Sequence, residues 1–147
     1  MALNITLGAL KAEALKMMGI NNAMNISEGD IFSLKNDPTY GTYIYAMTGA
    51  INRCLGRMYT VGALEKEPTQ TRTNTSETDD ISIYAEDITL TLANLIPLYI
   101  VGDVFALDEP SVAQNKRNEF EQALDEYVVK KAYNANTSEM ELVYTCE

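Results

Sequence analysis

Two acidic pairs are the residues of this chain whose types and spacing most suggest chemistry. Asp79 adjoins Asp80, and Asp108 adjoins Glu109. Carboxylates can hold a divalent cation or act as general acid and base. Adjacent side chains rarely point at one ion, however, and the spaced Asp/Asn pattern with glycine that marks a calcium loop is missing. We therefore interpret both pairs as solvated surface and expect no bound metal.

Histidine is absent from all 147 residues, which excludes several classes of catalytic site within this chain. A Ser-His-Asp triad, a Cys-His dyad and an HExxH zinc site all require it. Neither a GxxxxGK nor a GxGxxG loop is present to bind a nucleotide. Cys54 and Cys146 form no CxxC pair, which favours buried free thiols, with one disulfide as the alternative. The sequence predicts a protein that is not an enzyme and has no cofactor.

The charge balance restricts the partners. Eleven basic residues face 21 acidic ones, for a net charge of −10. This argues against a surface that grips DNA or an anionic membrane, because such contacts need clustered Lys and Arg. A nucleic acid passing nearby without binding is still compatible with it.

One apolar run is too short to be a membrane-spanning helix. Fifteen uncharged residues lie between Asp87 and Asp103, whereas a spanning helix needs roughly 20. We expect a buried core helix in a single soluble domain over residues 1–147.

Apolar residues at three- and four-residue steps predict the helices that carry any site. The first follows Thr6 as N-cap. The second starts near Pro38 and carries the longest stripe, made of Tyr40, Tyr43, Ile44, Met47, Ala50, Ile51, Cys54, Leu55 and Met58.

Gly49 and Gly56 interrupt this second helix. Residues this small admit the close approach of another helix. That helix belongs either to the same subunit or to a neighbouring one.

Prolines mark the later helices. A third helix runs from an N-cap at Asp87 to about Phe105, and Pro97 should kink or break it because proline lacks the backbone donor. A fourth begins near Pro110 and turns Phe120 and Leu124 inward.

Three segments are predicted to be non-helical. Residues 60–80 hold six threonines and no aromatic residue, which predicts an exposed, flexible loop, with a β-hairpin as the alternative. Ile81 and Ile83 suggest a short strand. From about residue 136 to residue 147 the side chains alternate in character, with Met140, Leu142 and Tyr144 on one side. A period of two residues is typical of a strand. Such a strand must pair with residues 81–84, a neighbouring subunit or another partner.

The predicted fold class is therefore mainly α. We expect a four- to five-helix bundle, with the loop or hairpin between the second and third long helices and a strand-like C-terminal tail.

Tyrosines crowd the start of the second helix at Tyr40, Tyr43 and Tyr45. One interpretation is packing at the rim of the core, with each hydroxyl at the water boundary. The other is a subunit interface, where tyrosine is enriched.

The order of these segments resembles a known family. The helix "IPLYIVGDVF", the acidic corner "ALDEPSVAQ" and the charged helix "NKRNEFEQALDEY" are similar to the small helical head–tail connector proteins of long-tailed bacteriophages and prophages. "LGALKAEALKMMG" and "YIYAMTGAINRCLGRM" agree as the earlier helices, so the resemblance covers about residues 5–133.

The resemblance implies a structural virion protein, assembled in the host bacterial cytoplasm and located in the neck. Copies would form a ring, usually twelve-fold, that docks beneath the portal protein and presents a platform to a downstream neck or tail protein. Genomic DNA would pass through the ring without specific binding, and no membrane would be involved. The resemblance also implies that the 60–80 loop lies near the channel, which gives Glu65, Lys66, Glu67 and Arg72 as channel candidates. The candidates for contact with portal or neighbouring subunits are Tyr40, Tyr43, Met140, Leu142 and Tyr144.

Three alternatives remain open from the sequence. The second hypothesis, after the connector, is another virion interaction module, such as a tail-completion or tail-terminator protein. A small acidic regulator that imitates DNA would need its carboxylates in a duplex-like stripe. A metal-dependent enzyme has the least support.

Overall fold

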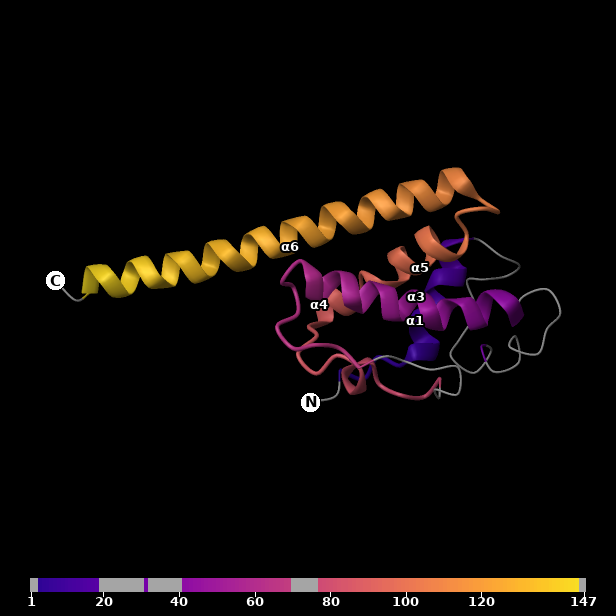
Figure 1. Ribbon diagram of the computed structural model, residues 1–147, viewed down its shortest axis with the longest axis horizontal. Helices are drawn as coiled ribbons and strands as arrows, with labels where there is room; N and C mark the ends of the chain where they lie inside the picture. Colours follow the sequence, from indigo (N-terminus) through magenta and orange to yellow (C-terminus); the bar gives the residue numbers. More distant parts are fainter. Residues whose placement is uncertain (1–2, 19–30, 32–40, 70–76, 146–147) are drawn as a thin grey trace.

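A computed structural model describes residues 3–18, 31, 41–69 and 77–145, with side chains as far as residue 134. These residues are mainly helical, which confirms the expected fold class at that level (Figure 1). Their elements are α1 (Leu7–Met17), α3 (Gly41–Thr60), the 3-10 helix η2 (Ile81–Ile83), α4 (Leu90–Ala93), α5 (Ile96–Val104) and α6 (Pro110–Thr145).

The first two long helices form as their apolar spacing predicts. Thr6 caps α1, and its Oγ1 accepts a hydrogen bond from the Ala9 N–H at 3.1 Å. The stripe on α3 is buried from Ile44 to Met58, whereas Arg53 and Arg57 lie on the exposed side. Burial of these apolar side chains is the main force that holds both helices in the core.

Pro97 divides the third predicted helix into two. The chain turns at Asn94 and Leu95, and Pro97 then lies in the first turn of α5, where its missing N–H costs no hydrogen bond. The expected N-cap at Asp87 is wrong. Thr89 caps α4 through a 3.3 Å bond from the Leu92 N–H, and Asp87 instead accepts a 2.8 Å bond from the Glu65 N–H.

Helix α5 is the centre of the bundle. It contacts α1, α3 and α6, and it buries Ile96, Ile100 and Val101. At Gly102 the backbone of α6 comes so close that an added Cβ would lie 3.1 Å from Arg117 Cβ and 3.3 Å from the Ala113 carbonyl oxygen. This close approach, rather than one at Gly49 or Gly56, joins two helices within the subunit.

The strand-like C-terminal tail is a wrong prediction, because residues 136–145 continue α6. Met140, Val143 and Tyr144 also have three- and four-residue spacing, so alternation over so few residues is ambiguous. Glu, Met and Leu favour helix, and a helix already formed extends without a new nucleation cost.

The expected strand at Ile81 and Ile83 is wrong as well, because η2 covers these residues. The end of the predicted loop instead lies antiparallel to the start of the chain. The Ile81 N–H donates to the Ile5 carbonyl at 2.9 Å, and the Leu7 N–H donates to the Asp79 carbonyl at 3.0 Å. Residues 61–69 and 77–80 contain neither helix nor strand beyond an isolated bridge of Thr6 with Asp80, and residues 70–76 lie outside the described part.

Candidate interaction surface

Helix α6 is the longest element of the molecule and its C-terminal part extends beyond all the other labelled helices (Figure 1). Its 36 residues correspond to about 54 Å of helix. Among its side chains described up to residue 134, Ala113, Phe120 and Leu124 are buried, and they anchor its first half against α5. Tyr99 of α5 meets the Phe120 ring edge-on, with ring centroids 5.1 Å apart.

Beyond Leu124 no described side chain of the helix is fully buried, although Tyr127 and Val128 still pack against the core on its inner face. Val129 is 59% exposed and Tyr133 is 68% exposed. These two residues are one turn apart, and the same face of the helix continues through positions 136, 140 and 144. The apolar stripe therefore starts on described, exposed side chains and runs in register toward the candidates Met140 and Tyr144. Leu142 lies two positions away from each of them, off this face.

A groove runs between α4 and the middle of α6. Its volume is about 510 Å³, and it is lined by Thr91, Leu95, Ala123, Glu126, Tyr127, Lys130, Lys131 and Asn134. The lining positions on α6 follow one face over more than two turns. The groove is therefore elongated along the helix, and its lining combines aliphatic and ring carbon with charged side chains.

A smaller hollow of about 80 Å³ lies on the other flank of α6, against the end of α3. It is lined by Arg57, Val61, Glu121, Leu124, Asp125 and Val128. The Arg57 guanidinium meets Glu121 at 2.9 Å across it, and this contact raises the pKa of Arg57. The hollow is too small to hold more than a single side chain.

Tyr43, a sequence candidate for the interface, holds the acidic corner of its own chain. Its hydroxyl donates to Asp108 Oδ2 at 2.6 Å, and its ring stacks on Phe105 with centroids 4.9 Å apart. The hydrogen bond to Asp108, together with burial, raises the pKa of Tyr43. Next to this contact Leu107 is 95% exposed. Tyr40 lies outside the described residues.

Two of the channel candidates in the loop form ion pairs with other segments of the chain. Glu65 pairs with Lys131 of α6 at 3.3 Å, and Lys66 pairs with Glu86 at 3.0 Å. Glu67 is exposed. Arg72 lies outside the described residues. The loop and α6 therefore meet at the Lys131 end of the α4–α6 groove.

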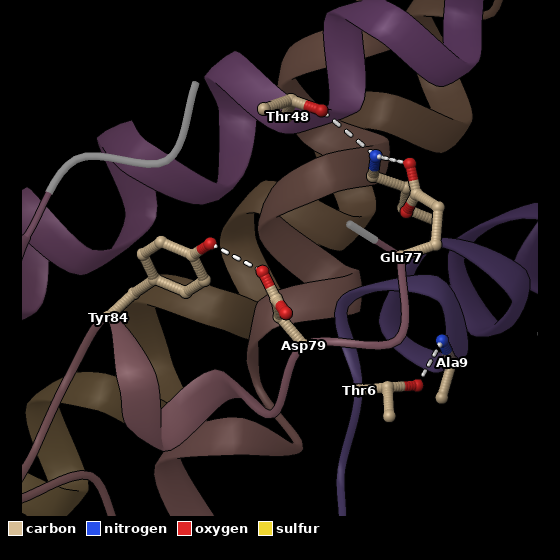
Figure 2. Close-up of polar contacts among 7 residues, drawn as sticks. Thr6, Ala9, Thr48, Glu77, Asp79 and Tyr84 are labelled. Atoms are coloured by element: carbon tan, nitrogen blue, oxygen red, sulfur yellow. Dashed lines mark hydrogen bonds and ion pairs between the residues drawn. The ribbon is translucent and has the colours of Figure 1, made fainter. Parts of the chain in front are cut away.

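A buried polar cluster was missed by the sequence analysis (Figure 2). The Lys11 ammonium lies 2.8 Å from Glu77 Oε1 and 2.9 Å from Thr48 Oγ1. Lys11 and Glu77 are each only 1% exposed. The sequence signal was the position of Lys11 beside Leu7, Leu10 and Leu15 on the inner face of α1. The cluster joins α1, α3 and the segment that leads into η2.

Within residues 3–18, 31, 41–69 and 77–145, no three carboxylate or thiol groups gather as a metal site would require. Among those same residues, no helix has the length and apolar character to cross a membrane. Cys54 is a buried free thiol, and desolvation raises its pKa well above the ordinary value.

No family model, curated protein or solved structure matches this chain. A functional proposal must therefore start from the geometry of the chain itself, and its main candidate surface is α6 with the adjoining α4–α6 groove.

Proposed function

We propose that this chain is a structural subunit of the neck of a long-tailed bacteriophage. Copies form a ring beneath the portal protein, usually twelve-fold, that extends the DNA channel and joins the head to the next neck or tail protein. The resemblance of the helix order to head–tail connectors supplies the family, and the mainly helical bundle is compatible with it.

The single observation that carries an assembly role is the extension of α6 past its own bundle (Figure 1). The extension needs no nucleation of its own, but packing of an apolar face supplies most helix stability in proteins, and the labelled helices of its own bundle do not reach it (Figure 1). Val129 and Tyr133 already expose apolar surface where the extension begins. A partner surface, from another copy or from the portal, would stabilise the segment that follows.

The distribution of charge supports a channel that lets DNA slide. Long-range ion pairs engage Arg53 with Asp103, Arg57 with Glu121, and Lys66 with Glu86. Basic side chains that are paired with carboxylates of the same chain are poorly placed to bind phosphates. The net charge of −10 also repels the phosphates. The same interleaving weakens the alternative of a DNA mimic, which would need carboxylates free of such partners.

Glu65, Lys66, Glu67 and Arg72 are kept in this proposal as channel residues. Tyr40, Met140, Leu142 and Tyr144 are kept as contacts with portal or neighbouring subunits. Tyr43 has a role inside the subunit, and its ring edge would reach a partner only beside the acidic corner that it holds.

Native mass spectrometry of the chain, alone and mixed with a portal protein encoded in the same genome, tests the proposal. The mixed sample is the decisive one, because a connector can stay monomeric until it meets the portal. We expect a ring bound to the portal assembly. A chain that ignores the portal but binds purified tail tubes would establish the tail-terminator alternative, and a chain that binds neither would contradict both.

A further inference from the structure

The groove between α4 and α6 has the shape that suits a helix. Its α6 wall is a single face formed by Ala123, Glu126, Tyr127, Lys130 and Asn134. Helices pack side by side with axes about 8–10 Å apart, in contact along such a face. The opposite wall, from Thr91 and Leu95, leaves an open trough rather than a closed pocket.

One lysine at the groove complements the acidic end of α6. Lys130 and Lys131 lie at the groove together with Glu126, and Lys131 is shared with Glu65 at 3.3 Å, so Lys130 is the cation that an incoming carboxylate would meet. The segment of α6 after Tyr133 contains Glu139 and Glu141 and no basic residue. An acidic helix with an apolar stripe would therefore find both apolar carbon and opposite charge in this groove.

The segment cannot reach the groove of its own chain. Helix α6 is continuous from Pro110 to Thr145, and residues 123–134 of this same helix form one wall of the groove. Residue 144 lies about 15 Å further along the axis than residue 134. Only the groove of another molecule is available to it.

We propose that residues 135–145 of one copy occupy the α4–α6 groove of a second copy. The contact is heterologous, since a different surface of each molecule is used, and such contacts close into rings or continue as open chains. This contact names the surfaces through which neighbouring subunits of the ring would meet. The ring itself rests on the proposed function.

The test uses two complementary variants. A chain ending at Asn136 keeps the groove but lacks all except the first two residues of the docking segment. The variant Thr91→Glu/Lys130→Glu keeps the docking segment but places negative charge on two exposed groove residues. Ser111→Glu/Lys116→Glu makes the same change of charge at the far end of α6 and is the matched control. Circular dichroism and thermal unfolding verify that each variant folds.

Sedimentation velocity over a range of concentrations gives the outcome. We expect the full chain and the control to self-associate, and each of the two variants to weaken association at least about tenfold. The shortened chain loses the docking segment, and the charge variant places like charges across the interface. An equimolar mixture of the two variants should give a 1:1 complex that does not grow, because it contains one intact docking segment and one intact groove per pair. Adding Glu139→Lys/Glu141→Lys to the groove variant should restore association.

Three results would overturn the inference: a full chain that is monomeric at every concentration, a groove variant that assembles as the full chain does, or a mixture without complex. The second would indicate symmetric pairing of α6 with α6. Portal binding is measured in separate samples. A monomer that binds portal rejects the groove contact and keeps the proposed function, whereas self-association through the groove without portal binding does the reverse.

Discussion

At the scale of single residues, the buried Lys11 is the most consequential feature of the interior. Its ammonium lies between Glu77 and Thr48, so this one side chain links α1, α3 and the segment that leads into η2 (Figure 2). A charge with 1% exposure is tolerated only because its partners replace the lost hydration.

Replacing Lys11 alone should be severe. We expect Lys11→Ala to lower the free energy of unfolding by about 3–5 kcal/mol, because the Glu77 carboxylate is left buried without its main counter-charge. The double variant Lys11→Met/Glu77→Leu should recover most of this loss, since apolar residues of similar volume remove both desolvation costs. Guanidinium denaturation measures both. A double variant no more stable than Lys11→Ala would contradict the explanation.

Asp80 has a different role, as an acceptor for backbone donors. Burial disfavours its charged form, but hydrogen bonds from Ser82 and from the N–H groups of Leu3 and Ile5 outweigh this and lower the pKa of Asp80. The charged form therefore fastens the N-terminal segment to the start of η2.

Asp80→Ala should lower the free energy of unfolding at neutral pH by about 1–2 kcal/mol. Because the pKa of Asp80 is lower in the folded chain, its contribution is present above the unfolded pKa and is lost as the pH falls through the folded pKa. The difference between the native chain and the variant should therefore shrink in acid. Urea denaturation across acidic pH checks this, with the exposed Asp125→Ala as control; a difference independent of pH would refute it.

At the scale of the elements, the crossing of α5 and α6 sets the direction of the long helix. Gly102 lets the two backbones approach, and the Arg117 side chain donates to the Gly102 carbonyl at the same point. The crossing therefore depends on one small residue and one long one.

Two glycine substitutions separate close packing from helix propensity. Gly102→Ala should destabilise by about 1–3 kcal/mol, because the new methyl group meets backbone atoms of α6 that cannot move aside independently. Gly56→Ala in α3 meets nothing within 4 Å and should stabilise by up to about 1 kcal/mol. Thermal unfolding distinguishes the two, and equal effects of the same sign would show that the crossing is not tightly packed.

At the scale of the whole molecule, the bundle and the extension of α6 should behave separately. The described buried residues of α6 end at Leu124. A chain ending at Asn136 should therefore keep the free energy of unfolding of the full chain in dilute solution, to within about 0.5 kcal/mol. Its helical circular dichroism should fall by the share of the removed turns. Loss of cooperative unfolding would mean that the segment packs on its own bundle.

Elements that depend on local patterns could be predicted from the residues alone. Thr6 caps its helix, the stripe from Ile44 to Met58 is buried, and Pro97 and Pro110 each fall at a helix start. These features follow from hydrogen bonding and apolar spacing within a few residues, so they can be predicted without a structure. The central position of α5 was legible too, because it is apolar on nearly every side.

The remaining features depend on how the elements pack in three dimensions. The alternation after residue 136 fits strand or helix, and the continuation of α6 settles it. The pairing of Lys11 with Glu77, the approach at Gly102 and the docking of residues 79–81 on the N-terminal segment all join residues far apart in the chain. The α4–α6 groove arises in the same way, from two helices whose relative placement no local pattern contains. Spacing along a chain reports which face of an element is apolar; which partner covers that face is determined by packing.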